Sequence, residues 1–95
     1  MQTTLTFTKD GKKYVSNKFN MGIACLINDR HVRNMNAKND DKVGIFSMCN
    51  DAVEKMFDGT EATQDVLESL PVRTRTSLCN KLFDIYMEEC FSKNE

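Results

Sequence analysis

The chain has 95 residues, enough for one hydrophobic core, and 40% of them are apolar while 28% are charged. That balance excludes a disordered chain, and no segment approaches the ~18 consecutive apolar residues of a membrane-spanning helix. The net charge is −1, and the first residues lack the basic-then-apolar layout of a signal peptide. We therefore expect a single domain over residues 1–95, located in the cytoplasm.

The charge is unevenly distributed along the chain. Residues 1–42 carry eight basic and four acidic side chains, a net +4, and residues 43–95 carry five basic and ten acidic ones, a net −5. Either the two halves simply have differently charged solvated faces, or the molecule orients on a charged partner or on another copy of itself. A basic half without interleaved aromatic residues is a weak signal for nucleic acid.

The four cysteines, at 25, 49, 79 and 90, form no CxxC pair and have no histidine at zinc-site spacing. We therefore expect no metal site and no cofactor. An even number of cysteines allows two disulfides. Cys25, Cys49 and Cys79, however, lie among apolar residues at helical spacing, which favours free thiols in a reducing compartment.

The N-terminal segment has the pattern of a β-hairpin over about residues 3–16. Apolar and hydroxyl side chains alternate from Thr3 to Thr8, and Asp10-Gly11 is a typical two-residue hairpin turn. Because an isolated hairpin is marginal in water, Leu5, Phe7 and Val15 must pack on elements from later in the chain.

Four helices are predicted after the hairpin, at about 21–34, 43–57, 62–69 and 71–91. Asn20 is the expected N-cap of the first, Asp40 or Asp41 of the second, Thr60 or Thr63 of the third and Ser69 of the last. Gly59 is expected to end the second helix in a left-handed conformation. The core stripe of that helix comprises Ile45, Phe46, Cys49, Ala52, Val53, Met56 and Phe57. The predicted fold is mainly α (α+β), an N-terminal β-hairpin packed on a bundle of about four helices.

The last helix is apolar over an unusually wide arc. Its core stripe is Leu78, Cys79, Leu82, Phe83, Tyr86 and Cys90. Ile85 widens the stripe on one side and Met87 and Phe91 on the other, so that apolar residues sweep about 240° of the circumference. Either a second element covers the excess, or it is a surface for a partner, the interpretation we favour.

A basic patch lies near the start of the same helix. Arg73, Arg75 and Lys81 either are solvated or contact an anion or an acidic partner, and the stem of Arg75 lies along the core edge. The candidate partner-binding residues are therefore Met87, Phe91, Ile85, Arg73 and Arg75.

No catalytic constellation is visible in the sequence. The only histidine, His31, lies in a polar stretch beside Arg30 and Arg33 and is expected to be a solvated surface side chain. The acidic pairs Asp40-Asp41 and Glu88-Glu89 lack an enclosed apolar setting that would change their pKa. We therefore expect no enzymatic activity.

The order of elements resembles a known family. A hairpin reading Leu5-Thr-Phe-Thr-Lys-Asp-Gly-Lys-Lys-Tyr14 leads into helices. Met56-Phe57-Asp58-Gly59-Thr60-Glu61, Val66-Leu67-Glu68-Ser69-Leu70-Pro71 and Leu82-Phe83-Asp84-Ile85-Tyr86-Met87-Glu88-Glu89 then come in this order along the chain. In this arrangement the chain is similar to the tail assembly chaperones of long-tailed bacteriophages of Gram-positive hosts.

This resemblance implies a cytoplasmic protein of the infected cell that is absent from the mature virion. Its expected partner is the long helical tape measure protein, with the tail tube protein and a second copy of the chain as further candidates. The family carries no catalytic residues and no cofactor. The alternative, from the residues alone, is a small phage-type regulator that binds nucleic acid or a host enzyme through Lys9, Lys12, Lys13, Arg30 and Arg33.

Overall fold

The computed structural model describes residues 3–91. Its elements, in order, are β1 (Thr6–Lys9), β2 (Lys12–Val15), α1 (Met21–Met35), the short 3-10 helix η1 (Asn39–Asp41), α2 (Ile45–Met56), α3 (Gln64–Glu68) and α4 (Val72–Phe91). The structure is 62% helical, and residues 3–91 form four α-helices and an antiparallel hairpin, which confirms the predicted fold class. The predicted helix bounds differ from these by at most two residues.

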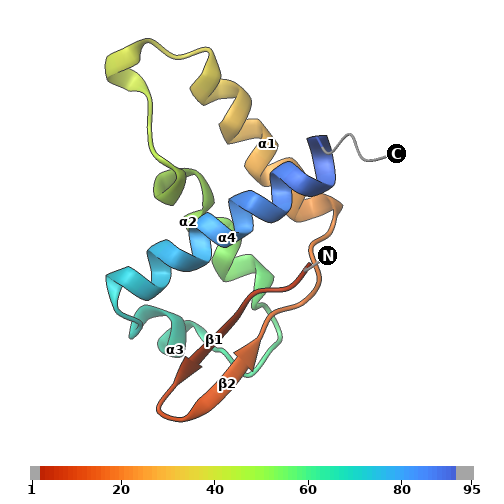
Figure 1. The fold of residues 1–95 in the computed structure, drawn as a ribbon, viewed down its shortest axis with the longest axis vertical. Coiled ribbons are helices and arrows are strands. Elements are labelled where there is room, and N and C mark those ends of the chain that lie inside the picture. The colour runs from red at the N-terminus through yellow and green to blue at the C-terminus, as the bar shows by residue number, and fades with distance from the viewer. Residues whose placement is uncertain (1–2, 92–95) are drawn as a thin grey trace.

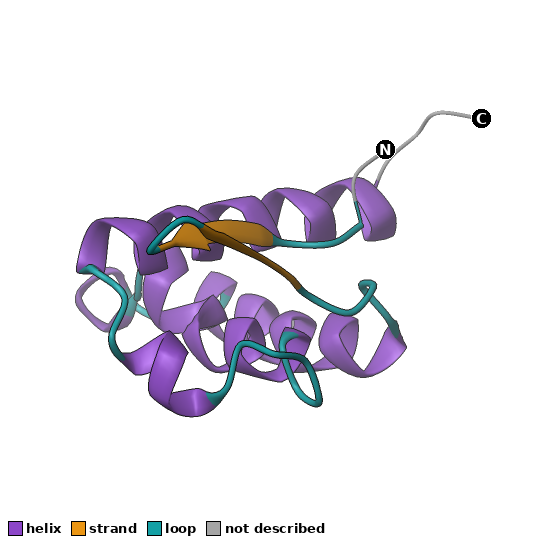
Figure 2. Cartoon of the chain, turned by 90° about the horizontal axis from the view of Figure 1, so that it is seen from below, coloured by secondary structure: helices purple, strands orange, loops and turns teal. Residues whose placement is uncertain are grey.

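The elements form two layers, one with the hairpin and α4 and the other with the remaining helices. In Figure 1, α4 crosses the middle of the molecule, between the hairpin and α1. Figure 2 shows the hairpin alongside the long helix that leads to the C-terminus, with other helices beneath them. Direct contacts join α4 to α2, α1 and β1. The last helix is therefore the central one, although it is last in sequence.

The hairpin turns at Asp10 and Gly11, whose φ angles of 54° and 80° confirm the predicted turn. Phe7 pairs with Tyr14 across the two strands, and their rings stack with centroids 5.0 Å apart. Val15 pairs with Thr6 on the opposite face and is 47% exposed. The predicted core role of Val15 is therefore wrong, because the two-residue period of a strand places Tyr14, not Val15, beside Phe7.

The helix ends agree only partly with the predicted caps. Asn20 caps α1 as expected, its Oδ1 accepting from the Ile23 N–H at 3.1 Å. Gly59 has the predicted left-handed conformation, with φ of 76°. Asp40 and Asp41 do not cap α2, because both lie in η1 and α2 begins after Gly44.

The third and fourth helices are joined by a tight connection. Thr63 caps α3, accepting from the Val66 N–H at 3.5 Å. Ser69 was expected to cap the last helix, but its hydroxyl donates to the Val66 carbonyl at 2.7 Å and closes α3 instead. No helix among residues 3–91 is long and apolar enough to cross a bilayer.

The core lies where α2 meets α4, with the hairpin and α1 closing its ends. In α2 the buried face includes Met48, whereas Phe46 is 40% exposed, so the predicted stripe is rotated slightly. This rotation follows from packing on both sides, since α2 contacts α4 and α1. The buried apolar residues are Leu5, Phe7, Ile23, Ala24, Ile27, Met48, Cys49, Ala52, Val53, Met56, Phe57, Ala62, Leu67, Leu70, Leu78, Cys79, Leu82, Ile85 and Tyr86.

Candidate partner-binding surface

The wide apolar arc of α4 divides into a buried part and an exposed part. The buried residues of this helix are Arg75, Leu78, Cys79, Leu82, Ile85 and Tyr86. At ~100° per residue they cover about 120° of the circumference, which is ordinary for a helix packed on one side. The remaining apolar side chains, Phe83, Met87, Cys90 and Phe91, are partly or well exposed. Other elements therefore cover part of the arc, and the rest of it is exposed.

Ile85 and Arg75 leave the set of candidate partner contacts. Ile85 is only 7% exposed and belongs to the core cluster. The helical period places it beside Leu78, at the edge of the arc that the core covers. A partner cannot reach it without unfolding the helix.

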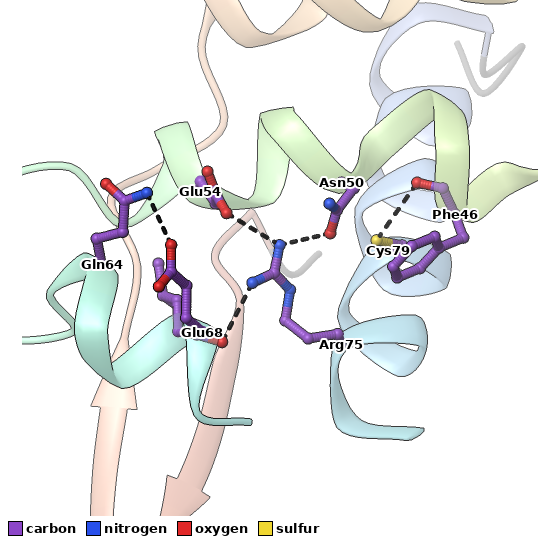
Figure 3. Close-up of polar contacts among 8 residues, drawn as sticks. Phe46, Asn50, Glu54, Gln64, Glu68, Arg75 and Cys79 are labelled. Atoms are coloured by element: carbon purple, nitrogen blue, oxygen red, sulfur yellow. Dashed lines mark hydrogen bonds and ion pairs between the residues drawn. The ribbon is translucent and has the colours of Figure 1, made fainter. Parts of the chain in front are cut away.

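Arg75 is 8% exposed, and its guanidinium, not only its stem, lies inside the protein. It donates to the Leu67 carbonyl at 3.1 Å and to Asn50 Oδ1, and it forms an ion pair with Glu54 at 3.3 Å (Figure 3). These bonds connect α4 to α2 and to α3. Arg75 is therefore a structural cross-link, because its planar fork reaches several acceptors at once.

Met87 and Phe91 remain available to a partner. Their side chains are 38% and 49% exposed at the C-terminal end of α4. Phe91 is not isolated, since its ring makes edge-to-face contacts with Tyr86 at 5.5 Å and with His31 at 6.3 Å between centroids. This partial packing holds an apolar anchor in place while leaving about half of it open.

His31 is half-buried, and its predicted place as a solvated surface side chain is wrong. Its ring packs edge-on against Phe83 at 5.4 Å and Tyr86 at 5.5 Å. The Tyr86 hydroxyl donates to Asn28 Oδ1 at 2.9 Å and lies 3.1 Å from His31 Nδ1. Because a hydroxyl has one proton, both bonds form together in the His31 tautomer that donates from Nδ1. This chain of bonds joins α1 to the C-terminal half of α4.

A row of exposed residues on α1 adjoins these anchors. Met21, Cys25, Asn28, Val32 and Met35 are all exposed and recur at alternating spacings of four and three residues. That spacing keeps side chains on one side of a helix and is the spacing of a helix–helix seam. The row runs the length of α1, and Asn28 at its centre contacts Tyr86 of α4.

We call the combined area the α1–α4 surface. It comprises Met21, Cys25, Asn28, Val32 and Met35 of α1 with Met87, Cys90 and Phe91 of α4. The sequence interpretation missed the α1 half of this surface. Cys25 of the row lies within the apolar run Ile23-Ala24-Cys25-Leu26-Ile27, most of which faces the core, so the row is not apparent in the sequence. Counting every third and fourth residue from Met21 would have found it.

Three of the four cysteine thiols have a raised pKa. All four thiols are free. Burial raises the pKa of Cys49 to about 12, with further contributions from Cys79 and Arg30 in opposite directions, and raises the pKa of Cys79 to about 11. Burial, then Glu89 and Cys25, also raise the pKa of Cys90. Thiolates, the reactive form, are therefore disfavoured at these three positions.

A hollow with three acidic lining residues lies between α2 and α3. Its volume is about 640 Å³, and Asp51, Glu54 and Asp58 are its acidic residues. Asp51 is paired with Arg30 at 2.8 Å and Glu54 with Arg75. Within residues 3–91, no three His, Cys, Asp or Glu side chains are grouped to hold a metal ion.

Comparisons with protein-family models, curated proteins and solved structures gave no match.

The basic N-terminal half is partly neutralised by ion pairs. Arg30 and Arg33, two of the residues expected to contact nucleic acid in the alternative function, pair with acids on α2 and on α1 itself. The pairs are Lys9–Asp10 at 3.0 Å, Lys12–Glu61 at 3.2 Å, Arg30–Asp51 at 2.8 Å and Arg33–Asp29 at 2.6 Å. Each pair weakens the positive potential that a polyanion would need.

Proposed function

We propose that this protein is a non-enzymatic binding protein that holds an amphipathic helix of a partner protein against the α1–α4 surface. The observation that carries the proposal is the exposed row of α1, spaced like a helix–helix seam, beside Met87 and Phe91. An amphipathic helix that binds through its apolar face presents apolar residues at alternating spacings of three and four residues to such a row. Exposed apolar side chains that line up along a whole helix differ from the scattered ones of an ordinary surface.

The chemistry of the surface suits a long or variable helical partner. Met21, Met35 and Met87 have flexible, polarizable side chains that adapt to different apolar contacts. Asn28 at the centre of the row is polar, and a single polar residue in a seam favours one register over others. Asp84 and Glu88, on the solvent side of α4, favour a partner helix with basic residues beside its apolar stripe.

The resemblance in element order supplies the specific form of the proposal. We propose that the chain is a tail assembly chaperone and that the partner helix belongs to a tape measure protein. A long helix with repeated apolar stripes would bind many copies, so that a modest surface on each copy suffices.

The test is co-expression with the tape measure protein encoded in the same genome. The wild-type chain should keep that protein soluble and should co-purify with it. Met87→Ser/Phe91→Ser and Val32→Ser/Met35→Ser should each lower the recovered partner, because each removes apolar contacts from the seam. Val15→Ser/Val72→Ser is the matched control, since both valines are exposed but lie on the hairpin and at the other end of α4.

Two results would contradict the proposal. The first is a soluble wild-type chain that never co-purifies with the tape measure protein. The second is an equal loss of binding in the control and in the seam variants at unchanged helical content. Salt-sensitive binding to DNA by the wild type, lost in Lys13→Gln, would favour the regulator instead.

A further inference from the structure

A groove that shares no residue with the α1–α4 surface lies between β1 and the first half of α4. Its volume is about 360 Å³. It is lined by Thr6, Phe7 and Thr8 of β1 and by Arg73, Thr74, Ser77, Leu78 and Lys81 of α4. The lining holds two cations and four hydroxyl groups, with no carboxylate among them.

The two cations have no acidic partner in the described part of the chain. Neither Arg73 nor Lys81 takes part in an ion pair there, whereas Lys9, Lys12, Arg30, Arg33 and Arg75 all do. Arg75 shows the contrast, since it lies two residues from Arg73 and is held by Glu54, Asn50 and the Leu67 carbonyl. The β1–α4 groove therefore keeps its positive charge.

The hydroxyl groups of the groove are also uncommitted. Among residues 3–91, the side chains of Thr6, Thr8, Thr74 and Ser77 form no hydrogen bond with another part of the protein. This differs from Thr60, Thr63 and Ser69, whose hydroxyls each bond to the backbone. A hydroxyl donates one proton, so the four groups can complete the coordination of an anion held by Arg73 and Lys81.

The charges of α4 run against its own dipole. Its first turn holds Arg73 and no acid, and its last turn holds no base. Acids near the N-terminus and bases near the C-terminus would stabilise the helix by about 0.3–1 kcal/mol each. The reverse arrangement, found in α4, weakens the helix slightly. The positive end of the helix dipole and both cations then attract an anion to the same groove.

The size of the basic area identifies the kind of anion. Arg73 and Lys81 are eight residues apart, about 12 Å along the helix, and the next turn carries Asp84. An extended phosphate backbone would meet that carboxylate and Glu88 beyond it. Phe7 supplies the one aromatic ring in the groove lining, and because it is buried it offers no stacking surface for bases. A short acidic segment with two or three carboxylates fits better.

We propose that the β1–α4 groove docks an acidic segment of a protein partner, with Arg73 and Lys81 binding its carboxylates and the Thr6, Thr8, Thr74 and Ser77 hydroxyls completing the contacts. This site is separate from the α1–α4 surface and does not depend on the function proposed for it.

The experiment is an amide NMR titration of the full chain with a short disordered peptide of alternating Glu and Ser. The peptide should shift the resonances of Thr6, Thr8, Thr74 and Ser77, and Arg73→Gln/Lys81→Gln should weaken its binding about tenfold. Lys18→Gln/Lys38→Gln removes the same charge elsewhere and should bind as the wild type does. A peptide with Gln in place of Glu should leave the groove resonances unchanged.

The same titration distinguishes the other outcomes. Equal binding of the Gln peptide, or equal weakening in both double variants, would overturn the proposal. Tighter binding of inorganic phosphate or of a single-stranded oligonucleotide of equal charge would also overturn it, in favour of a phosphate site. Met87→Ser/Phe91→Ser should bind the acidic peptide normally, even if the tape measure protein never binds. Loss of peptide binding in that variant would show that the two sites are not separate.

Discussion

The two sides of α4 face different environments. Toward α2, Leu78, Cys79 and Leu82 are closed from solvent, and Arg75 seals the end of that side with bonds to three partners. Toward α1, Met87 and Phe91 stay open, although Phe91 packs against His31 and Tyr86. One helix thus supplies both part of the core and part of the exposed surface for which we propose a binding role, and hydrophobicity alone does not distinguish the two. Only the elements packed around the helix do so.

Truncating one residue on each side should give the largest contrast. Leu82→Ala removes a fully buried side chain between α4 and the core and should lower the free energy of unfolding by about 3 kcal/mol, since the cavity relaxes only in part. Met87→Ala should change it by less than about 1 kcal/mol. Urea unfolding followed by circular dichroism measures both. Equal losses would mean that α1 covers Met87 more fully in solution.

The next largest effect separates two arginines that lie two residues apart in the first turn of α4. Arg75→Ala leaves Glu54, Asn50 and the Leu67 carbonyl without their donor and should cost about 2–3 kcal/mol of stability. Glu54 is partly exposed, which keeps the loss below that of a fully buried pair. Arg73→Ala, on the exposed side, should change stability by no more than about 0.5 kcal/mol. A comparable loss in both variants would contradict the assignment of Arg75 as the cross-link.

A smaller effect tests the join between α1 and α4. Tyr86→Phe keeps the ring but removes the hydroxyl that donates to Asn28 and lies beside His31. The expected loss of stability is about 1–2 kcal/mol, because the hydroxyl makes two hydrogen bonds and each has a usual net value of about 1 kcal/mol. Hydrogen exchange should increase in the middle of α1 more than in α2. Unchanged exchange in α1 would mean that the rings, and not the hydroxyl, hold the two helices together.

The sequence predicted the parts of the fold that depend on local order. The Asp10-Gly11 turn, the Asn20 cap and all four helices follow from residues near one another in the chain. The wrong predictions concern residues whose burial depends on elements distant in the sequence. Val15 turned outward because of strand register, and Arg75 and Ile85 were buried by α2, α3 and the core. Half of the candidate surface, on α1, was missed because its row overlaps an apolar run that faces the core.

The last effect is absent at neutral pH and appears only at alkaline pH, on the closed side of α4. In the unfolded chain the pKa of Cys49 and Cys79 is near the ordinary thiol value of 9.0, whereas in the folded protein burial raises their pKa to about 12 and about 11. Above pH 9 and up to the folded-state pKa values, the unfolded state therefore binds fewer protons than the folded state. The free energy of unfolding should fall as pH rises above 9. Below that pH both states hold neutral thiols and the contribution is fully present.

Cys49→Ala/Cys79→Ala should show a shallower decline in the free energy of unfolding from pH 8 to 10 than the wild type in urea unfolding, whatever its stability at neutral pH. Equal slopes in the double variant and in the wild type would show that solvent reaches the closed side of α4.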